Sequence, residues 1–211
     1  MLEQQALFDQ AHQIVFLTGA GVSTASGIPD FRSANGLYKQ NQNAEYFLSH
    51  RYFQSDPEGF YQFCKDNLYF PDTKSNVIHE KQAAYTKHLV DFHGNLFDVY
   101  CEKCGAHVPV EEYLTSRLHK LDQGPLRPNI VLYDEGISQV AINQSLAAMQ
   151  AADLVVVVGT SMKVYPFASL LEYAKPGVKI LAVNQEPLEL PGNFEMVVAD
   201  AMDFFEQLVV R

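Results

Sequence analysis

The stretch IVFLTGAGVSTASGIPDFR, residues 14–32, decides how this chain folds. It opens with four consecutive apolar residues, Ile14 to Leu17, a pattern typical of a strand buried on both faces of a parallel sheet. The turn Gly19-Ala20-Gly21 follows directly. Glycine lets the backbone turn sharply and approach a ligand closely, and a helix beginning near Ser23 would direct its positive end at a phosphate. The stretch therefore predicts a nucleotide site at the end of the first strand.

The glycine pattern alone leaves two interpretations open. Thr24 stands where the usual dinucleotide fingerprint has its third glycine, so the turn could bind a phosphate or could be an ordinary tight strand-to-helix turn. Asp30, Phe31 and Arg32 favour the first interpretation, because they place a carboxylate, a ring and a guanidinium on a loop where packing does not require them. Thr24 also disfavours a hydride-transferring dehydrogenase.

Apolar runs separated by helical stretches continue this pattern along the chain. Residues 154–158 and 179–183 predict two more buried strands, the first followed by Gly159-Thr160-Ser161 and the second by Asn184. Ligands bind at the carboxyl edge of open parallel sheets, so these polar residues are candidates for a nucleotide site. For Asn184, a role in capping a turn is equally open. The spacing predicts an α/β fold with a doubly wound parallel sheet.

Composition narrows the class of protein. A chain of 211 residues, 47% of them hydrophobic, fits one substantial domain or one domain with a small insertion. A formal net charge of −10 disfavours nucleic-acid binding and would attract a basic peptide. Three cysteines argue against a disulfide framework, and no apolar run approaches the about 18 residues of a membrane span. We therefore expect a cytoplasmic protein with neither nucleic-acid nor membrane partners.

The motif GAGVSTASGIPDFRS, residues 19–33, closely resembles the signature of the sirtuins, the NAD-dependent protein deacylases. Later motifs agree with the family in order and span most of the chain: Phe92-His93-Gly94, residues 126–131, Gly159-Thr160-Ser161, Val164-Tyr165-Pro166, Asn184 and Asp200-Ala201. The resemblance implies a Rossmann-like NAD domain with a smaller insertion. It also implies acyl-lysine protein or peptide substrates, an acyl group transferred to ADP-ribose, and release of nicotinamide.

The resemblance assigns roles to individual residues. His93 would be the general base that takes a proton from an NAD ribose hydroxyl, although a lone histidine of this kind is more often structural. Residues 33–43 would form a loop that closes over NAD. The cofactor-binding residues would be Gly19, Ala20, Gly21, Asp30, Phe31, Arg32, Gly159, Thr160, Ser161, Asn184, Asp200 and Ala201. The peptide would lie between Tyr133, Asp134, Glu135 and Gly136 on one side and Lys163, Val164 and Tyr165 on the other.

The insertion is expected to be small and could bind zinc. We expect residues 1–33 and 125–211, with about 65–100, in the NAD domain, and about 34–64 and 101–124 in the insertion. Cys101 and Cys104 have the spacing of half a tetrahedral zinc site. The family completes a structural site with a second cysteine pair, which residues 116–124 lack. His107 or His119 could substitute; otherwise Cys101 and Cys104 are two reduced thiols without a metal.

The chain departs from the family between His79 and His93. Asn76 and His79 match a family pair whose histidine is usually structural, but only fourteen positions then separate His79 from His93. A sirtuin would include a strand ending in Thr-Gln-Asn-Ile-Asp here, whose side chains contact nicotinamide and its ribose. Either the chain is naturally shortened or the sequence omits a segment of the protein. An intact mass near 23.7 kDa would contradict the omission.

Two other functions stay open because of this gap. The chain could be a non-catalytic module that binds NAD or ADP-ribose, or an enzyme that transfers ADP-ribose from NAD to a protein. A further departure concerns the acyl group. Tyr61 resembles the tyrosine of a Tyr-x-x-Arg pair found in sirtuins that prefer acidic acyl groups, but Cys64 replaces the arginine. Desuccinylation is therefore disfavoured, and packing in the core is the simpler role for this aromatic stretch.

Overall fold

The computed structural model describes residues 3–41 and 43–211, which divide into two compact units. The first unit comprises the chain up to Phe31, Asp72–Val90 and Gln139–Arg211. The second comprises Arg32–Pro71 and Asp91–Ser138. Among the described residues, no helix is both long and apolar enough to cross a membrane.

A four-stranded parallel sheet forms the centre of the first unit. Its strands are β1 (Ile14–Thr18), β5 (Leu154–Val158), β6 (Lys179–Asn184) and β7 (Glu195–Val198), in the order β1-β5-β6-β7. β1 pairs in parallel with β5, and β5 with β6, without a shift of register. The carboxyl ends of all four strands therefore lie at the same edge. The predicted α/β fold with a parallel sheet is confirmed.

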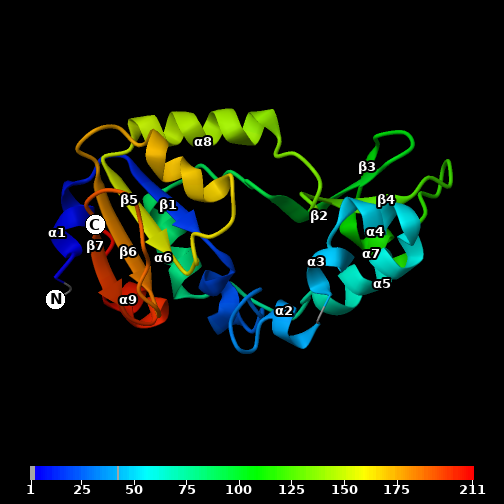
Figure 1. Cartoon of the computed structure of the whole chain (residues 1–211), viewed down its shortest axis with the longest axis horizontal. Helices are drawn as coiled ribbons and strands as arrows, with labels where there is room; N and C mark the ends of the chain where they lie inside the picture. The colour runs from blue at the N-terminus through cyan, green and yellow to red at the C-terminus, as the bar shows by residue number, and fades with distance from the viewer. Residues whose placement is uncertain (1–2, 42) are drawn as a thin grey trace. The chain divides into compact units, whose positions relative to one another are not determined.

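Helices cover both faces of this sheet (Figure 1). One face packs against α1 (Gln5–Gln10), α6 (Val77–Tyr85) and α9 (Ala201–Gln207), which contribute Phe8, Ile78, Phe204 and Phe205 to the largest core cluster. Figure 1 shows α8 (Gln139–Ala151) on the opposite side, where it contacts the 3-10 helix η2 (Phe167–Tyr173). All five residues of β5 are buried, which explains its uninterrupted apolar sequence.

The second unit is built on a three-stranded antiparallel sheet. β2 (Gly94–Cys101) lies between β3 (His107–Val108) and β4 (Leu126–Ile130), with Gly94 opposite Ile130 and Cys101 opposite Leu126. The helices of this unit are α2 (Leu37–Gln40), α3 (Ala44–Phe47), α4 (His50–Ser55), α5 (Pro57–Asn67) and α7 (Val110–Thr115).

The limits of the units differ from those expected. Residues 32–33, 65–71, 91–100 and 125–138 lie in the second unit and not in the first as expected. The last two ranges do so because β2 and β4 pair with each other and not with the parallel sheet. An apolar run in a sequence indicates that a strand is buried, but it does not show which strand is its partner or in which direction that partner runs. The antiparallel pairing of β2 with β4 could therefore not be predicted from the sequence. The stretch 44–52 does not form one continuous helix, because the Ser49 side chain accepts a hydrogen bond from the Tyr52 N–H and begins a new helix.

The aromatic stretch of α5 packs in the core, as the simpler interpretation expected. Asp56 caps the helix and Pro57 is its first residue. The Tyr61 ring is 8% exposed, contacts Tyr113 edge to face at 5.1 Å and donates its hydroxyl hydrogen to the Leu114 carbonyl. Cys64 is fully buried, and burial raises the pKa of its thiol to about 12. Neither side chain is available to a substrate.

Candidate functional site

Four groups of predicted cofactor residues meet at the carboxyl edge of the parallel sheet. Gly19-Ala20-Gly21 follows β1, Gly159-Thr160-Ser161 follows β5, Asn184 ends β6, and Asp200-Ala201 follows β7. These segments lie far apart in the sequence, and the parallel pairing of the strands brings them to one side of the unit. This arrangement is the one that open α/β sheets use to bind ligands.

The glycines are required because two turns touch each other. A Cβ atom on Gly19 or on Gly21 would lie 2.6 Å from the carbonyl oxygen of Gly159, too close for any side chain. Gly159 itself has φ +59°, and a Cβ there would lie 2.6 Å from the Val22 nitrogen. We call this contact between the β1 turn and the β5 turn the glycine interlock, comprising Gly19, Gly21 and Gly159.

The interlock corrects one expectation about the phosphate turn. The Gly21 N–H donates to the Gly159 carbonyl at 2.9 Å, and the Gly19 N–H donates to the Val158 carbonyl at 3.2 Å. The N–H groups of both glycines are therefore used inside the protein and are not available to a phosphate. The helix that follows is the 3-10 helix η1 (Ala20–Ser26), which begins at Ala20 and not near Ser23 as expected. Of the two interpretations that the sequence left open for Gly19-Ala20-Gly21, the tight strand-to-helix turn is therefore at least part of its role.

The polar residues of β6 and β7 are held in place by their neighbours. The Asn184 side chain donates to the Glu186 carbonyl at 2.9 Å, the turn-capping contact that the sequence left open. The Asp200 carboxylate accepts the Met202 N–H at 2.8 Å, which caps α9, and its other oxygen accepts the Gln185 side-chain amide at 2.9 Å. Both side chains are ordered before any ligand binds.

Two exposed rings lie in the predicted binding loops of the first unit. Phe31 is 36% exposed at the end of the loop that carries Asp30, and Tyr165 is 72% exposed in the segment Lys163-Val164-Tyr165. This segment follows a turn in which the Thr160 hydroxyl accepts the Met162 N–H at 3.1 Å. Large exposed apolar rings on polar loops are the groups that a ligand or peptide can cover.

In the second unit, the predicted cofactor loop touches the predicted peptide segment. The hydroxyls of Tyr38, on α2, and Tyr133 are 2.6 Å apart. The Arg32 guanidinium lies 5.3 Å from the centre of the Tyr38 ring, within the range of a cation–π contact. Burial raises the pKa of Tyr38, so its hydroxyl stays protonated and can donate. α2 itself was not expected, because its sequence lies in a polar stretch.

The peptide segment is fixed by its backbone and by a buried ion pair. The Tyr133 N–H donates to the Leu48 carbonyl and the Tyr133 carbonyl accepts the His50 N–H, both at 2.9 Å. Two residues later, the Glu135 carboxylate forms a bidentate pair with the buried Arg127 guanidinium, at 2.7 and 2.9 Å. Although burial opposes its ionisation, the bonds from Arg127 lower the pKa of Glu135 to about 2. The Glu135 carboxylate therefore binds groups of the protein itself, and its side chain is not directed at a peptide.

His93 stands at the start of β2, between a buried ring and a constrained glycine. Phe92 is buried, and its ring centre is 5.2 Å from that of His93. Gly94 has φ +84°, and a Cβ there would lie 2.0 Å from the Asn129 carbonyl oxygen, so only glycine fits. Part of the His93 ring is exposed, yet the surrounding protein lowers its pKa. At neutral pH the ring is therefore uncharged and able to accept a proton.

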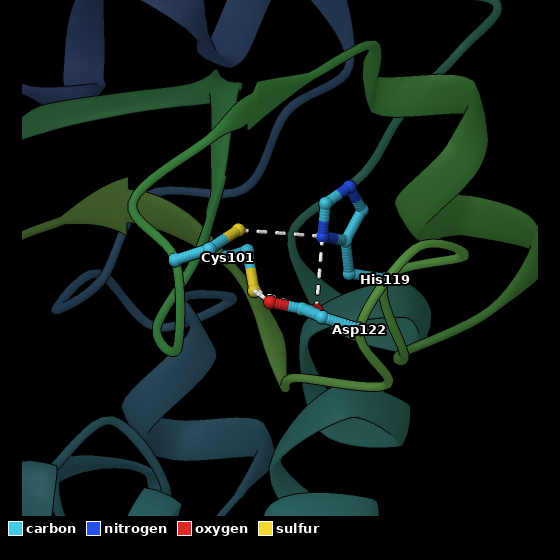
Figure 2. A group of neighbouring side chains, drawn as sticks. Cys101, His119 and Asp122 are labelled. Atoms are coloured by element: carbon cyan, nitrogen blue, oxygen red, sulfur yellow. Dashed lines mark hydrogen bonds and ion pairs between the residues drawn. The ribbon is translucent and has the colours of Figure 1, made fainter.

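A cluster of four possible metal ligands lies at the other end of β2. Cys101, Cys104, His119 and Asp122 each place a ligand atom within 4.8 Å of the others. Figure 2 shows the Asp122 side chain next to both the Cys101 sulfur and the His119 ring. His119 was one of the two histidines expected to be able to replace the missing cysteine pair. Asp122 was not expected; its position three residues after His119 is the signal that could have identified it.

The distances within this cluster fit a tetrahedral zinc site. The Cys104 sulfur is 3.5 Å from His119 Nδ1, the Cys101 sulfur is 3.5 Å from the Asp122 carboxylate, and His119 Nδ1 is 3.0 Å from Asp122. Zinc bond lengths of about 2.0–2.3 Å at tetrahedral angles separate such ligand atoms by about 3.3–3.8 Å, so the two sulfur distances lie in this range, whereas His119 and Asp122 would have to move apart by a few tenths of an ångström. A hydrogen bond from the Gly124 N–H lowers the pKa of Asp122 to about 2, which keeps this ligand ionised.

His107, the other expected substitute, is engaged elsewhere. Its Nδ1 atom pairs with the Asp98 carboxylate at 2.5 Å. The metal cluster therefore takes its third and fourth ligands, His119 and Asp122, from the segment just before β4. A metal bound by all four residues would link the two ends of the segment that connects β2 to β4.

The segment in which the sequence departs from the sirtuin pattern is the connection between α6 and β2. Residues 86–93 alone join the end of α6 to the start of β2. This connection has the sequence TKHLVDFH, which contains no glutamine or asparagine. The chain therefore has no side chains here that match the Gln and Asn of the expected motif.

Comparison with known proteins gives consistent results along most of the chain. The sequence model of the Sir2 family matches residues 19–84 and 76–166. An NAD-dependent protein deacetylase of Lactiplantibacillus plantarum is 52% identical over 227 aligned residues, covering 98% of this chain and 97% of the relative. One from Listeria monocytogenes serotype 4b is 46% identical over 220 residues, covering 94% and 96%. Both alignments are longer than this chain, so each relative has residues without a counterpart here.

Solved structures agree with the sequence comparisons. A Sir2 variant with a deacetylated p53 peptide and 3'-O-acetyl-ADP-ribose has a TM-score of 0.85 at 30% identity, covering 98% of this chain and 96% of the other. Sir2 with a p53 peptide and NAD has a TM-score of 0.80 at 31% identity, covering 97% and 95%.

Proposed function

The chain belongs to the Sir2 family and is an NAD-dependent protein deacetylase, and we propose that His93 is its general base. The observation that carries this assignment is the environment of His93. It stands at a fixed position between Phe92 and Gly94, partly exposed, with a pKa below that of an ordinary histidine. An uncharged imidazole at neutral pH can take a proton from a ribose hydroxyl.

The carboxyl edge of the parallel sheet suits NAD. When bound, NAD supplies ADP-ribose as the acceptor of the acyl group and releases nicotinamide. Ala20 is the candidate for a phosphate contact, because the N–H groups of Gly19, Gly21 and Val22 donate to the carbonyls of Val158, Gly159 and Gly19. Thr160, Ser161, Asn184, Asp200 and Ala201 would line the rest of the site, and Asp30, Phe31 and Arg32 would shape its reactive end.

An acyl-lysine peptide is the substrate that this family membership supports. We infer that residues 133–136 and residues 163–165 both contribute to peptide binding, through main-chain hydrogen bonds other than those that Tyr133 makes with Leu48 and His50. The net charge of −10 favours basic peptides over nucleic acids. A cytoplasmic location remains a prediction, and so does the absence of nucleic-acid and membrane partners.

The residues of the second unit fit a structural zinc ion. Cys101, Cys104, His119 and Asp122 would hold it, joining the end of β2 to the segment before β4. The ion would stabilise this unit and take no part in acyl transfer, because all four protein ligands close the site.

The test is mass spectrometry of an acetyl-lysine peptide incubated with this chain, with and without NAD. We expect NAD-dependent loss of the acetyl group and formation of O-acetyl-ADP-ribose. His93→Ala should abolish turnover and leave NAD binding, measured by calorimetry, within about twofold; unchanged turnover would remove the assigned role of His93.

Because the connection 86–93 is short, the same assay also tests the alternative of a non-catalytic module that binds NAD or ADP-ribose. NAD binding without turnover by the unmodified chain would favour this module. Transfer of label from NAD to protein, without loss of acetyl, would instead indicate ADP-ribosyl transfer.

A further inference from the structure

The side chain of Asn76 has two sets of contacts, one within its own helix and one with η1. Its oxygen accepts the Ile78 N–H at 2.9 Å and so caps α6. Its amide nitrogen donates to the Val22 carbonyl at 2.9 Å and lies 3.0 Å from the Ser26 hydroxyl. Capping α6 needs only the oxygen. The amide group of Asn76 is therefore specifically suited to hold η1.

His79 makes a third contact with the same segment. Its Nδ1 atom accepts the Asn76 N–H at 3.2 Å, and its Nε2 atom lies 3.1 Å from the Ser23 hydroxyl. A backbone N–H can only donate, so the neutral ring carries its proton on Nε2 and donates it to Ser23. This tautomer excludes His79 as a base that activates Ser23. The histidine instead orients the Ser23 hydroxyl.

We propose that Asn76 and His79 are positioning residues that hold η1 in its NAD-binding conformation before the cofactor arrives. The glycine interlock fixes the first residues of this segment, and the contacts of Asn76 and His79 fix Val22, Ser23 and Ser26. If a segment is already ordered before the ligand arrives, binding does not have to supply the entropic cost of ordering it. The proposal rests on the assignment of NAD to this edge of the sheet.

The environment of His79 agrees with this role. Burial lowers the pKa of its ring, which favours the uncharged tautomer that both contacts require. Protonation would place a hydrogen on Nδ1, facing the Asn76 N–H.

Two substitutions separate the positioning role from helix capping. Asn76→Ser keeps a good N-cap but loses the amide that contacts Val22 and Ser26. His79→Gln keeps the residue type that completes a capping box but loses the ring nitrogen that contacts Ser23. Glu80→Gln is the matched control, an exposed position in the same first turn of α6.

The first readout is hydrogen exchange without NAD. We expect amides of residues 22–27 to exchange about fivefold faster or more in Asn76→Ser and His79→Gln, the effect of losing about one hydrogen bond. Amides in the middle of α6 should be unchanged in both variants, and Glu80→Gln should match the unmodified chain. Uniform acceleration through α6 would show a merely structural role and would overturn the proposal.

The second readout is the dissociation constant for NAD, measured by calorimetry. We expect it to rise about fivefold or more in both variants and not in the control. Variants that bind NAD as the unmodified chain does would overturn the positioning role. If the unmodified chain itself binds no NAD, the assignment of NAD to this edge fails, while the hydrogen-exchange result still tests whether Asn76 and His79 hold η1.

Discussion

The buried pair of Arg127 and Glu135 should respond very differently to the loss of each partner. Glu135→Gln removes the carboxylate that holds the guanidinium at 2.7 and 2.9 Å. The Arg127 side chain is 3% exposed, and the remaining carboxylate near it, that of Glu102, is 3.4 Å away. Leaving a buried charge without its partner costs about 3–5 kcal/mol, a large part of the about 5–15 kcal/mol that keeps a domain folded.

Arg127→Met should cost less than Glu135→Gln. The Glu135 side chain is 21% exposed and keeps the His50 ring at 2.7 Å and the Leu132 N–H at 3.0 Å as partners. The double substitution Arg127→Met with Glu135→Gln should recover part of the loss, because it removes the uncompensated charge altogether.

Urea unfolding, followed by circular dichroism because the chain has no tryptophan, measures these differences. Metal release, recorded with a colorimetric chelator, reports the second unit separately. A Glu135→Gln variant that loses less than about 1 kcal/mol, or that is no less stable than the double variant, would refute the argument from an unpaired buried charge.

The same pair predicts a dependence on acid. Arg127 lowers the pKa of Glu135 to about 2, below the about 4.3 of an unfolded glutamate. The carboxylate therefore contributes stability above about pH 4.3, and this contribution is lost as the pH falls toward 2. The free energy of unfolding of Glu135→Gln should fall less steeply than that of the unmodified chain across this interval.

Three further predictions concern the metal, the base and the loop. His119→Ala should weaken zinc binding by more than about tenfold in chelator competition, because it removes one of four ligands; binding as tight as in the unmodified chain would exclude His119 as a ligand. The acid limb of kcat/KM should have its midpoint below about pH 6.5, because the pKa of His93 is lowered; a midpoint above 6.5 would contradict a role for the neutral ring. Tyr133→Phe and Tyr38→Phe should each raise the KM for NAD by at most about fivefold, and the double variant should add nothing, since both remove one hydrogen bond; additive effects would show separate roles.

Much of the first unit follows from its sequence because its strands are apolar runs, although β1 lies at the edge of the sheet and only its Leu17 is buried, not the whole run as the sequence predicted. Residues 14–17, 154–158 and 180–183 are apolar without interruption, and all three lie in strands of one parallel sheet. The polar residues that follow them were found for the same reason. What the glycines do could not be read in advance, because the contact between Gly21 and Gly159 joins two turns far apart in the sequence.

The second unit was harder to predict because its elements are short and its contacts are not local. β3 has two residues and α2 has four, too few to show a period. The metal cluster was half visible, because two cysteines have a recognisable spacing whereas His119 and Asp122 do not stand out among the other residues of their segment. Glu135 looked like a residue that faces a substrate, and only the position of Arg127 shows that its carboxylate is used internally.

The glycine interlock limits how the cofactor end of the sheet can change by mutation. Since Gly19 and Gly21 each leave no room beside Gly159, a side chain cannot be added to either turn unless the other turn moves as well. A single substitution at any of these three positions should therefore disrupt the contact between the turns. A shift of one turn would require simultaneous changes at two sites about 140 residues apart in the chain. Variation in cofactor affinity should accumulate instead in neighbours such as Thr24 and Ser161, and a library built to alter that affinity should leave the three glycines untouched.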